Sequence, residues 1–437
     1  MRTLIDFYYD FFKTASKLLQ NSRDAELTST QEIETISIDK NGVPKRSHIK
    51  RIRYDTLPSK YHKELSNLME FKNLINFLKE HADIAAIYKG PVNEWTLIWD
   101  FVLNPLSEFL KQTRTLTLKK RDFIRFSNEI DRYLKERRFK VCVLTPIIGL
   151  EGKYDKMKLF DNLSIRRLTI NELEELFKES GHFGDFVRSN PEKLRFAVVT
   201  DAYQLVDGSG ISVMGVIDEH KRAITALRLF DGSLASIDCK IHYAYKAGFA
   251  KESFGFSYIE PTRIARGNIQ LLHKKGWRNF QRFWKRFSEI TKKHAFVDIA
   301  VRRLDRLFER TLIDDIIIDS MIGIEALFVE SSGELSYKIS TRAALLLEEM
   351  PIYDNGEGLK SRRLFEMLKT SYNIRSQIVH GGDVAKEQKE FTKKYGMDVS
   401  HFLIWCLYTS LTILIVEISR TRNKFNREDF YNSLIVG

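Results

Sequence analysis

The chain has 437 residues, of which 43% are apolar and 12% aromatic, so it is long enough for two or three domains that each bury a core. The formal net charge is +12, and half of this surplus lies in residues 265–437. This composition excludes a disordered or low-complexity chain. The positive charge is spread over the folded body and is compatible with a nucleic-acid partner.

The cysteines and histidines argue against a disulfide framework and a metal centre. Cys142, Cys239 and Cys406 are isolated from one another, and none belongs to a CxxC pair. The ten histidines are dispersed without metal-ligand spacing. We therefore expect no metal and no other cofactor, and a reducing, cytoplasmic location.

Two features argue against a membrane or export role. Asp6 and Asp10 interrupt the apolar pattern of the first 20 residues, which is unlike a signal peptide. The longest apolar run, residues 402–416, is shorter than the roughly 20 residues of a membrane span. We interpret it as a deeply buried helix.

Residues 1–138 are predicted to be mostly helical, with one hairpin. Two runs with alternating polarity flank Asn41-Gly42, the pair of residues favoured in a tight hairpin turn. Pro58 ends this pattern. Helices are expected over residues 3–20, 60–88, 93–113 and 120–138, and the hairpin strands over 34–39 and 48–54.

Residues 139–262 are predicted to form an α+β domain with a mostly antiparallel sheet. Thr169 and Glu172 form a capping-box pattern that starts a helix over residues 170–179. A boundary is expected at Pro261–Gly267. Strands are expected over residues 140–146, 158–168, 195–205 and 237–245, and a second helix over 219–230.

Basic and aromatic residues alternate between residues 273 and 294, a mixture found in RNA-binding surfaces. The aromatic residues fall at i, i+3, i+7 and i+10, which indicates one buried face of a helix more than a platform for base stacking. The basic residues on the other faces could still hold a phosphate backbone. The aromatic positions are Trp277, Phe280, Trp284 and Phe287, and the basic ones are Arg278, Arg282, Lys285 and Arg286.

Residues 314–328 predict a buried helix that carries acids within an apolar run. The helical neighbours of Glu325 at three and four residues are all apolar, so its carboxylate needs a partner or a proton. Arg375 is the expected partner. Asp315 and Asp319 lie four apart on one face and are expected to join the same network. The alternative is a structural ion pair with Arg342 or another basic core residue.

The segment Tyr372–Gly382 holds an arginine and a histidine five residues apart at the end of a predicted helix. Gly381 is the expected left-handed stop of a helix over residues 360–380. Positions five apart lie about 140° from each other on a helix, so Arg375 and His380 do not converge on a straight one. Either the helix distorts, or two copies face each other across a dimer axis. A capping histidine beside a surface arginine is the alternative without function.

Several blocks, in this order, resemble an ApeA-like HEPN domain, a helical domain that often acts as a ribonuclease. The resemblance covers roughly residues 265–437. The blocks are Phe283-Trp-Lys, Ala300-Val-Arg-Arg303, Asp315-Ile-Ile-Ile-Asp319, Ile324-Glu-Ala-Leu327, Leu335-Ser-Tyr-Lys338, Arg342-Ala-Ala-Leu and Tyr372-Asn-Ile-Arg-Ser-Gln-Ile-Val-His-Gly.

The resemblance implies a metal-independent endoribonuclease, in anti-phage defence or toxin-like growth arrest, that pairs as a homodimer through this domain. Arg375 and His380 would be catalytic. Glu325, with Asp319 or Asp315, would orient Arg375, and Tyr372 would support the site. Ser376 fills the place directly after the arginine, where Asn or Asp is more usual. The partners would be RNA and a phage-derived trigger or regulator at the N-terminal region.

The fold expected for the whole chain is α+β and mainly α, with a C-terminal all-α bundle (265–437) after a mixed α/β region (1–138 and 139–262). No GxxxxGK[ST], GxSxG or HExxH is present. Asp238-Cys-Lys240 only weakly suggests a metal-dependent DNA nuclease. Two further alternatives are a non-catalytic HEPN module that binds RNA or protein and a scaffold with no nucleic-acid role.

Overall fold

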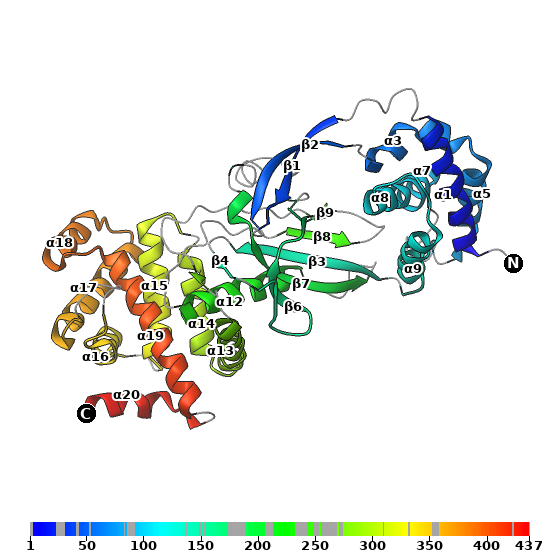
Figure 1. The fold of residues 1–437 in the computed structure, drawn as a ribbon. Coiled ribbons are helices and arrows are strands. Elements are labelled where there is room, and N and C mark those ends of the chain that lie inside the picture. Colours follow the sequence, from blue (N-terminus) through cyan, green and yellow to red (C-terminus); the bar gives the residue numbers. More distant parts are fainter. Residues whose placement is uncertain are drawn as a thin grey trace. The chain divides into compact units, whose positions relative to one another are not determined.

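The computed structural model divides the chain into two compact units, each assembled from separate stretches of sequence. Unit 1 contains residues 1–146, 168–217 and 241–258, and unit 2 contains 147–167, 218–240 and 259–437. The fold is α+β and mainly α, as predicted (Figure 1). The described residues are 3–22, 31–40, 43–51, 54–82, 84, 92–136, 138–147, 150–152, 154–170, 172–173, 176, 189, 191–205, 213–231, 243–247, 253–254, 269–270, 274–308, 310–330, 333–351, 358–421 and 424–436.

Unit 1 combines a helical cluster with strands. The π-helical segment η2 continues α7 directly into α8. Its helices are α1 (Leu4–Asn21), α3 (Leu57–Lys60), α4 (His62–Ser66), α5 (Met69–Glu80), α7 (Glu94–Ile98), η2 (Trp99–Leu103), α8 (Asn104–Thr113) and α9 (Lys120–Glu136), with short 3₁₀ turns η1 (Tyr54–Thr56) and η3 (Pro191–Lys193).

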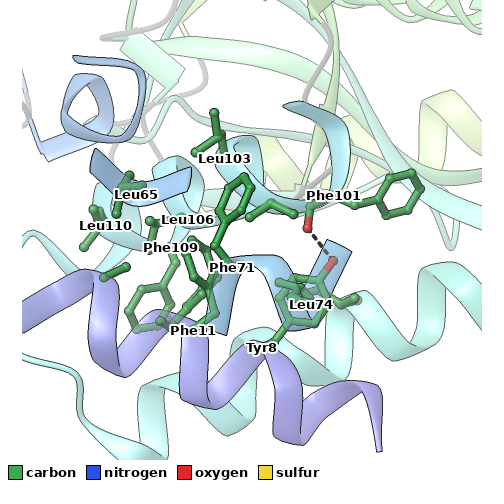
Figure 2. Packing of buried hydrophobic residues seen from close by; sticks show 14 of the residues in the cluster. Tyr8, Phe11, Leu65, Phe71, Leu74, Phe101, Leu103, Leu106, Phe109 and Leu110 are labelled. Carbon is green, nitrogen blue, oxygen red and sulfur yellow. Dashed lines mark hydrogen bonds between the residues drawn. The ribbon is translucent and has the colours of Figure 1, made fainter. Parts of the chain in front are cut away.

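The first helix organises the core of unit 1. Thr3 and Asp6 form a reciprocal capping box, which satisfies free N–H groups at the start of α1. The aromatic face of α1 is buried against α5, α8 and α9 (Figure 2). The Tyr8 hydroxyl donates a hydrogen bond of 2.5 Å to the Phe101 carbonyl oxygen in η2. Burial raises the pKa of the Tyr8 phenol well above its usual range, so it remains a donor.

The strands of unit 1 belong to two sheets. β1 (Gln31–Ile38) and β2 (Pro44–Arg51) pair antiparallel, from Gln31 opposite Arg51 to Ile38 opposite Pro44, as the hairpin prediction required. The predicted turn residues Asn41 and Gly42 lie outside the described residues. Four strands of unit 1 lie next to one another in the second sheet, in the order β7–β3–β8–β9; they are β3 (Arg138–Ile147), β7 (Phe196–Leu205), β8 (Tyr243–Ala247) and β9 (Ser253–Phe254).

Unit 2 is built mainly from helices. Two segments that the sequence analysis grouped with the middle region, 147–167 and 218–240, cluster with the C-terminal helices. Its elements are β4 (Leu150–Glu151), β5 (Lys156–Lys158), β6 (Leu163–Arg167), α12 (Val213–Asp231, which starts in unit 1), β10 (Ile269–Gln270), α13 (Lys274–Lys293), α14 (Ala295–Leu307), α15 (Ile313–Phe328), α16 (Leu335–Leu347), α17 (Ser361–Val379), α18 (Ala385–Tyr395), α19 (Val399–Thr421) and α20 (Arg427–Val436).

The predictions for the middle of the chain have different outcomes. The capping box is confirmed, because the Thr169 N–H and hydroxyl both donate to Glu172 at 2.8 Å. Most of the helix expected after it, the boundary at residues 261–267 and the Asp238–Lys240 triplet lie outside the described residues. The domain limits at 138 and 262 stay a prediction.

The aromatic stripe of α13 is core, as its spacing indicated. Trp277, Phe280, Trp284 and Phe287 are all buried. Trp284 packs on Phe160, with ring centroids 5.6 Å apart. A base-stacking role is excluded for these four rings in this conformation because their faces are covered by protein.

A polar seam joins α12 to α14. The Arg222 guanidinium lies 2.7 Å from the Asp298 carboxylate, and the Thr225 hydroxyl donates to Asp305 at 3.1 Å. Arg228 is fully buried, lies 3.7 Å from Asp305 and stacks over the Phe308 ring at 3.5 Å. These contacts fix the position of α12 along α14.

Among the described residues, α19 is the one helix long and apolar enough to cross a membrane by length and composition. Of its most apolar window, 72% is buried inside the protein. A core helix of a soluble protein has this property, and α19 contacts α13, α14, α15, α16, α17 and α18. The prediction that residues 402–416 form a buried helix is confirmed.

Replacing Tyr8 by Phe should lower the free energy of unfolding by about 1–2 kcal/mol, because the buried Phe101 carbonyl loses its hydrogen bond while the ring still packs. Urea denaturation measures the change. Tyr9→Phe is the matched control, since Tyr9 is only half-buried and packs on Phe123 through its ring. Equal effects of the two substitutions would contradict the role of the Tyr8 hydroxyl.

Candidate functional site

The candidate site is built on α15, which is buried along most of its length. Gly323 lies where α14 and α19 come close to this helix. A Cβ atom at this position would be 2.8 Å from a Leu407 methyl and 3.3 Å from the Arg303 Cβ. The absence of a side chain therefore allows α14 and α19 to pack against α15 just before Glu325.

The C-terminal end of α15 is held by side chains from α16 and α20. A helix leaves its last four carbonyl oxygens without partners inside the helix. Arg427 donates to the Ala326 and Val329 carbonyl oxygens at 2.7 and 2.9 Å. Arg342 donates to Phe328 O at 2.8 Å, and the Tyr431 hydroxyl to Leu327 O at 3.0 Å. We call Arg342, Arg427 and Tyr431 the α15 clamp.

The clamp is itself held by ion pairs and ring contacts. Arg427 lies 2.6 Å from the Glu330 carboxylate and over the Phe296 ring at 4.6 Å. Arg342 pairs with Glu428, the residue after Arg427. The clamp therefore fixes the last turn of α15, the turn that begins at Glu325.

Glu325 pairs with Arg375, as the sequence predicted. The Arg375 Nη2 atom lies 3.6 Å from the Glu325 Oε2 atom, and both side chains are about three-quarters buried. Burial raises the pKa of the Glu325 carboxyl, and the Arg375 guanidinium partly opposes this. Glu325 Oε1 and Arg375 Nε are buried without a hydrogen-bond partner in the described part of the chain. Both groups therefore retain hydrogen-bonding capacity.

Asp319 and Asp315 do not join this pair. The buried Asp319 carboxylate contacts Arg303 Nη1 at 2.5 Å and Arg310 Nε at 2.8 Å. Asp315 lies 3.7 Å from Arg310. The expectation that either acid orients Arg375 is thus corrected, because both contact arginines that come from α14 and the segment after it.

The C-terminal end of α17 agrees closely with the prediction. Gly381 has φ +77°, and its N–H donates to Ile378 O at 3.0 Å. The Gly382 N–H donates to Gln377 O at 2.9 Å. These two bonds define a Schellman motif, in which a glycine in the left-handed region ends the helix. His380 is the C-cap, and its side chain is exposed.

Arg375 and His380 have different surroundings on α17. Arg375 is mostly buried against Glu325, whereas His380 is exposed at the cap. The helix stays regular through Val379, so the distortion considered from sequence does not occur. Tyr372 and Ser376 are half-buried. Tyr372 precedes Arg375 by three residues and is its neighbour on the helix surface, whereas Ser376 follows Arg375 directly and points about 100° away from it. The Ser376 carbonyl oxygen accepts a bond from the His380 N–H at 3.2 Å.

The basic residues predicted on α13 are exposed, but they lie away from α17. Arg278, Arg282, Lys285 and Arg286 are on the face opposite the buried aromatic stripe. Within unit 2, α13 packs on α14, α19 and β5, and Figure 1 shows α17 and α18 at the other end of this unit. These four residues therefore form a basic stripe separate from the Arg375–His380 segment.

The described residues contain no group of three or more His, Cys, Asp or Glu side chains that could hold a metal ion.

Sequence reasoning did not single out four of the residues that hold α15. They are the clamp residues Arg427 and Tyr431 and the arginines Arg303 and Arg310, which pair with Asp319. No local motif marks them, since their hydrogen-bond partners lie 9 to 104 residues away.

No protein-family model matches the chain, and neither a curated protein nor a solved structure matches it.

Replacing Arg427 by Ala should lower the free energy of unfolding by about 2–5 kcal/mol, because it leaves helix-end carbonyls and Glu330 without their cation. Arg420→Ala is the matched control, since Arg420 is exposed and pairs with Glu417 on the same helix, and it should cost less than about 1 kcal/mol. Chemical denaturation compares them. A cost for Arg427→Ala no larger than that of the control would refute the clamp.

The buried Glu325–Arg375 pair also predicts that the stability of the protein depends on pH. Because the pKa of the Glu325 carboxyl is raised in the folded state, its contribution to the free energy of unfolding is most favourable at low pH. This contribution is lost as the pH rises through that raised pKa. Glu325→Gln cannot ionise. The free energy of unfolding of the Glu325→Gln variant should therefore improve, relative to that of the wild type, as the pH rises from about 4 to about 7. Urea denaturation at several pH values tests this, and a difference independent of pH would contradict it.

Proposed function

We propose that the chain is a metal-independent endoribonuclease of the HEPN type, acting in anti-phage defence or toxin-like growth arrest. The observation that carries the proposal is the end of α17, where Arg375 is held by Glu325 on a clamped helix and His380 is exposed five residues later. The Schellman glycine ends the helix with backbone bonds alone. The His380 side chain is thus available for chemistry.

The proposed reaction uses the 2′-hydroxyl of the substrate as nucleophile. It attacks the adjacent phosphorus, and the bond to the 5′-oxygen of the next nucleotide breaks. His380 accepts the hydroxyl proton or donates one to the leaving oxygen, a contribution of typically 10²- to 10⁴-fold. Arg375 stabilises the charge that develops on the phosphate oxygens. The products carry a 2′,3′-cyclic phosphate and a 5′-hydroxyl, and DNA, which lacks the nucleophile, is not cleaved.

The proposal includes a homodimer through the helical region and a cytoplasmic location. On one helix, side chains five positions apart point about 140° away from each other. A second protomer could bring its His380 toward the Arg375 of the first. Tyr372 and Ser376, four residues apart on α17, would lie beside Arg375, and the basic stripe of α13 would bind RNA away from the Arg375–His380 segment. The N-terminal region would respond to a phage-derived trigger or regulatory partner.

A non-catalytic RNA-binding or protein-binding module is the second candidate. The observation that favours it is the basic stripe of α13, which is exposed and remote from the Arg375–His380 segment. Such a surface could hold RNA without turnover. Binding that is independent of His380 is the property that separates this candidate from the first.

The test is cleavage of a mixed RNA pool in EDTA by the purified full-length protein. Arg375→Ala and His380→Ala should each lower the rate at least 10²-fold. Arg362→Ala and His401→Ala are the matched controls, because both side chains are well exposed elsewhere in the helical unit, and both should cleave like the wild type. End analysis should find cyclic phosphates.

Other outcomes separate the proposal from its alternatives. Cleavage that survives 2′-O-methylation of every ribose would exclude the mechanism. If the wild type does not cleave and its expression is no more toxic in cells than that of His380→Ala, the binding module is favoured. If only the wild type is toxic, the nuclease acts in cells after a trigger.

A further inference from the structure

A shallow hollow of about 400 Å³ lies on α18, the helix that begins five residues after His380. Three lysines contribute to its lining at positions i, i+3 and i+7, so they share one face of the helix. Two acids complete the charged lining. The lining residues are Asp383, Ala385, Lys386, Lys389, Glu390 and Lys393.

The opposite face of α18 attaches the helix firmly to the rest of unit 2. Phe391 and Tyr395 are buried there. The Gln388 side chain donates to Asp314 at 3.1 Å, at the start of α15. The Arg363 guanidinium, from the first turn of α17, donates to Tyr395 O at 3.2 Å. The lysine face is therefore held in a fixed position on unit 2, and its first residue, Lys386, follows His380 by six residues in the chain.

The charges in the hollow are only partly compensated. Lys386 lies 3.9 Å from Glu390, an exposed pair of little energetic weight. Lys389 and Lys393 form no ion pair with any residue in the described part of the chain. The Asp383 carboxylate accepts a hydrogen bond of 2.9 Å from the N–H of Ala385, the first residue of α18. A net positive, solvated face of this kind suits a polyanion.

The lysine spacing fits a nucleic-acid strand. Seven residues of helix span about 10 Å, which corresponds to about three phosphates at the roughly 3.4 Å spacing of a stacked strand. The carboxylate of Glu390 can accept hydrogen bonds from ribose 2′-hydroxyls and base amino groups, which RNA supplies and a lipid phosphate surface does not.

We propose that the α18 hollow is a subsite for single-stranded RNA, in which Lys386, Lys389 and Lys393 bind the phosphates that flank the cleaved one. The inference rests on the proposed ribonuclease function and assigns the path of its substrate to α18, separately from the basic stripe of α13. Its ligand class is an oligoribonucleotide several nucleotides long.

The experiment measures RNA binding without cleavage. A labelled 20-nucleotide single strand is titrated with full-length protein carrying His380→Ala, over a range of salt concentrations. The test variant adds Lys386→Gln, Lys389→Gln and Lys393→Gln. The matched control adds Lys13→Gln, Lys17→Gln and Lys72→Gln, three exposed lysines of unit 1. Glutamine preserves helix propensity, and a thermal melt verifies folding.

Removing three phosphate contacts should lower the slope of log K against log salt by about 2, since each contributes about 0.7 for a single strand. At 0.1 M salt, this corresponds to a loss of affinity of roughly 10²-fold. The control should keep the slope of the His380→Ala parent. A folded test variant with the parent's slope would overturn the proposal.

Further arms separate the proposal from its alternatives. With an intact His380, the triple lysine variant should lose kcat/KM on the 20-mer and keep it on a dinucleotide. If the wild type cleaves no RNA but the variant still loses affinity, the subsite stands and the nuclease falls. If the variant keeps RNA affinity but loses binding to vesicles containing phosphatidylserine, the hollow is a membrane contact and the RNA subsite is refuted.

Discussion

The helical unit, unit 2, depends on hydrogen-bond donors for the last carbonyl oxygens of one buried helix, α15. The last carbonyl oxygens of α15 emerge where water has little access, and an unpaired buried carbonyl is costly. Arg427, Arg342 and Tyr431 supply the missing donors from two other helices. Because two of these donors carry positive charge, they also complement the negative end of the helix dipole. The turn that carries Glu325 is thereby fixed from outside α15.

The acids of α15 are neutralised to different degrees, and this difference distinguishes a structural pair from a candidate site. Asp319 is nearly inaccessible and has two arginines within 2.8 Å. Glu325 has one arginine at 3.6 Å, and each partner keeps a polar atom without a hydrogen bond in the described region. Since buried polar groups normally have partners, the second arrangement leaves capacity for a ligand. Both carboxylate oxygens of Asp319 are already engaged by arginines.

The features that depend on local periodicity were predictable from the sequence, and those that depend on distant partners were not. The faces of α13, the buried α19, the capping box at Thr169 and the helix stop at Gly381 all arise from spacing and backbone preference. Helical spacing also placed Glu325 on an apolar face that needs a partner. It could not decide which arginine each acid meets, because that choice depends on how α14 and α17 pack on α15. The assignment of Asp319 was wrong for this reason.

The helical unit is not continuous in sequence, and this limits how the gene can be rearranged. Residues 147–167 and 218–240 belong to it although they lie upstream of α13. Gln281 donates to the Lys158 carbonyl oxygen, and Lys292 lies over the Phe160 ring. Recombination that exchanged everything before residue 259 would uncover the α13 core unless the incoming gene supplied both stretches in compatible form. The helices therefore cannot be inherited as an independent cassette.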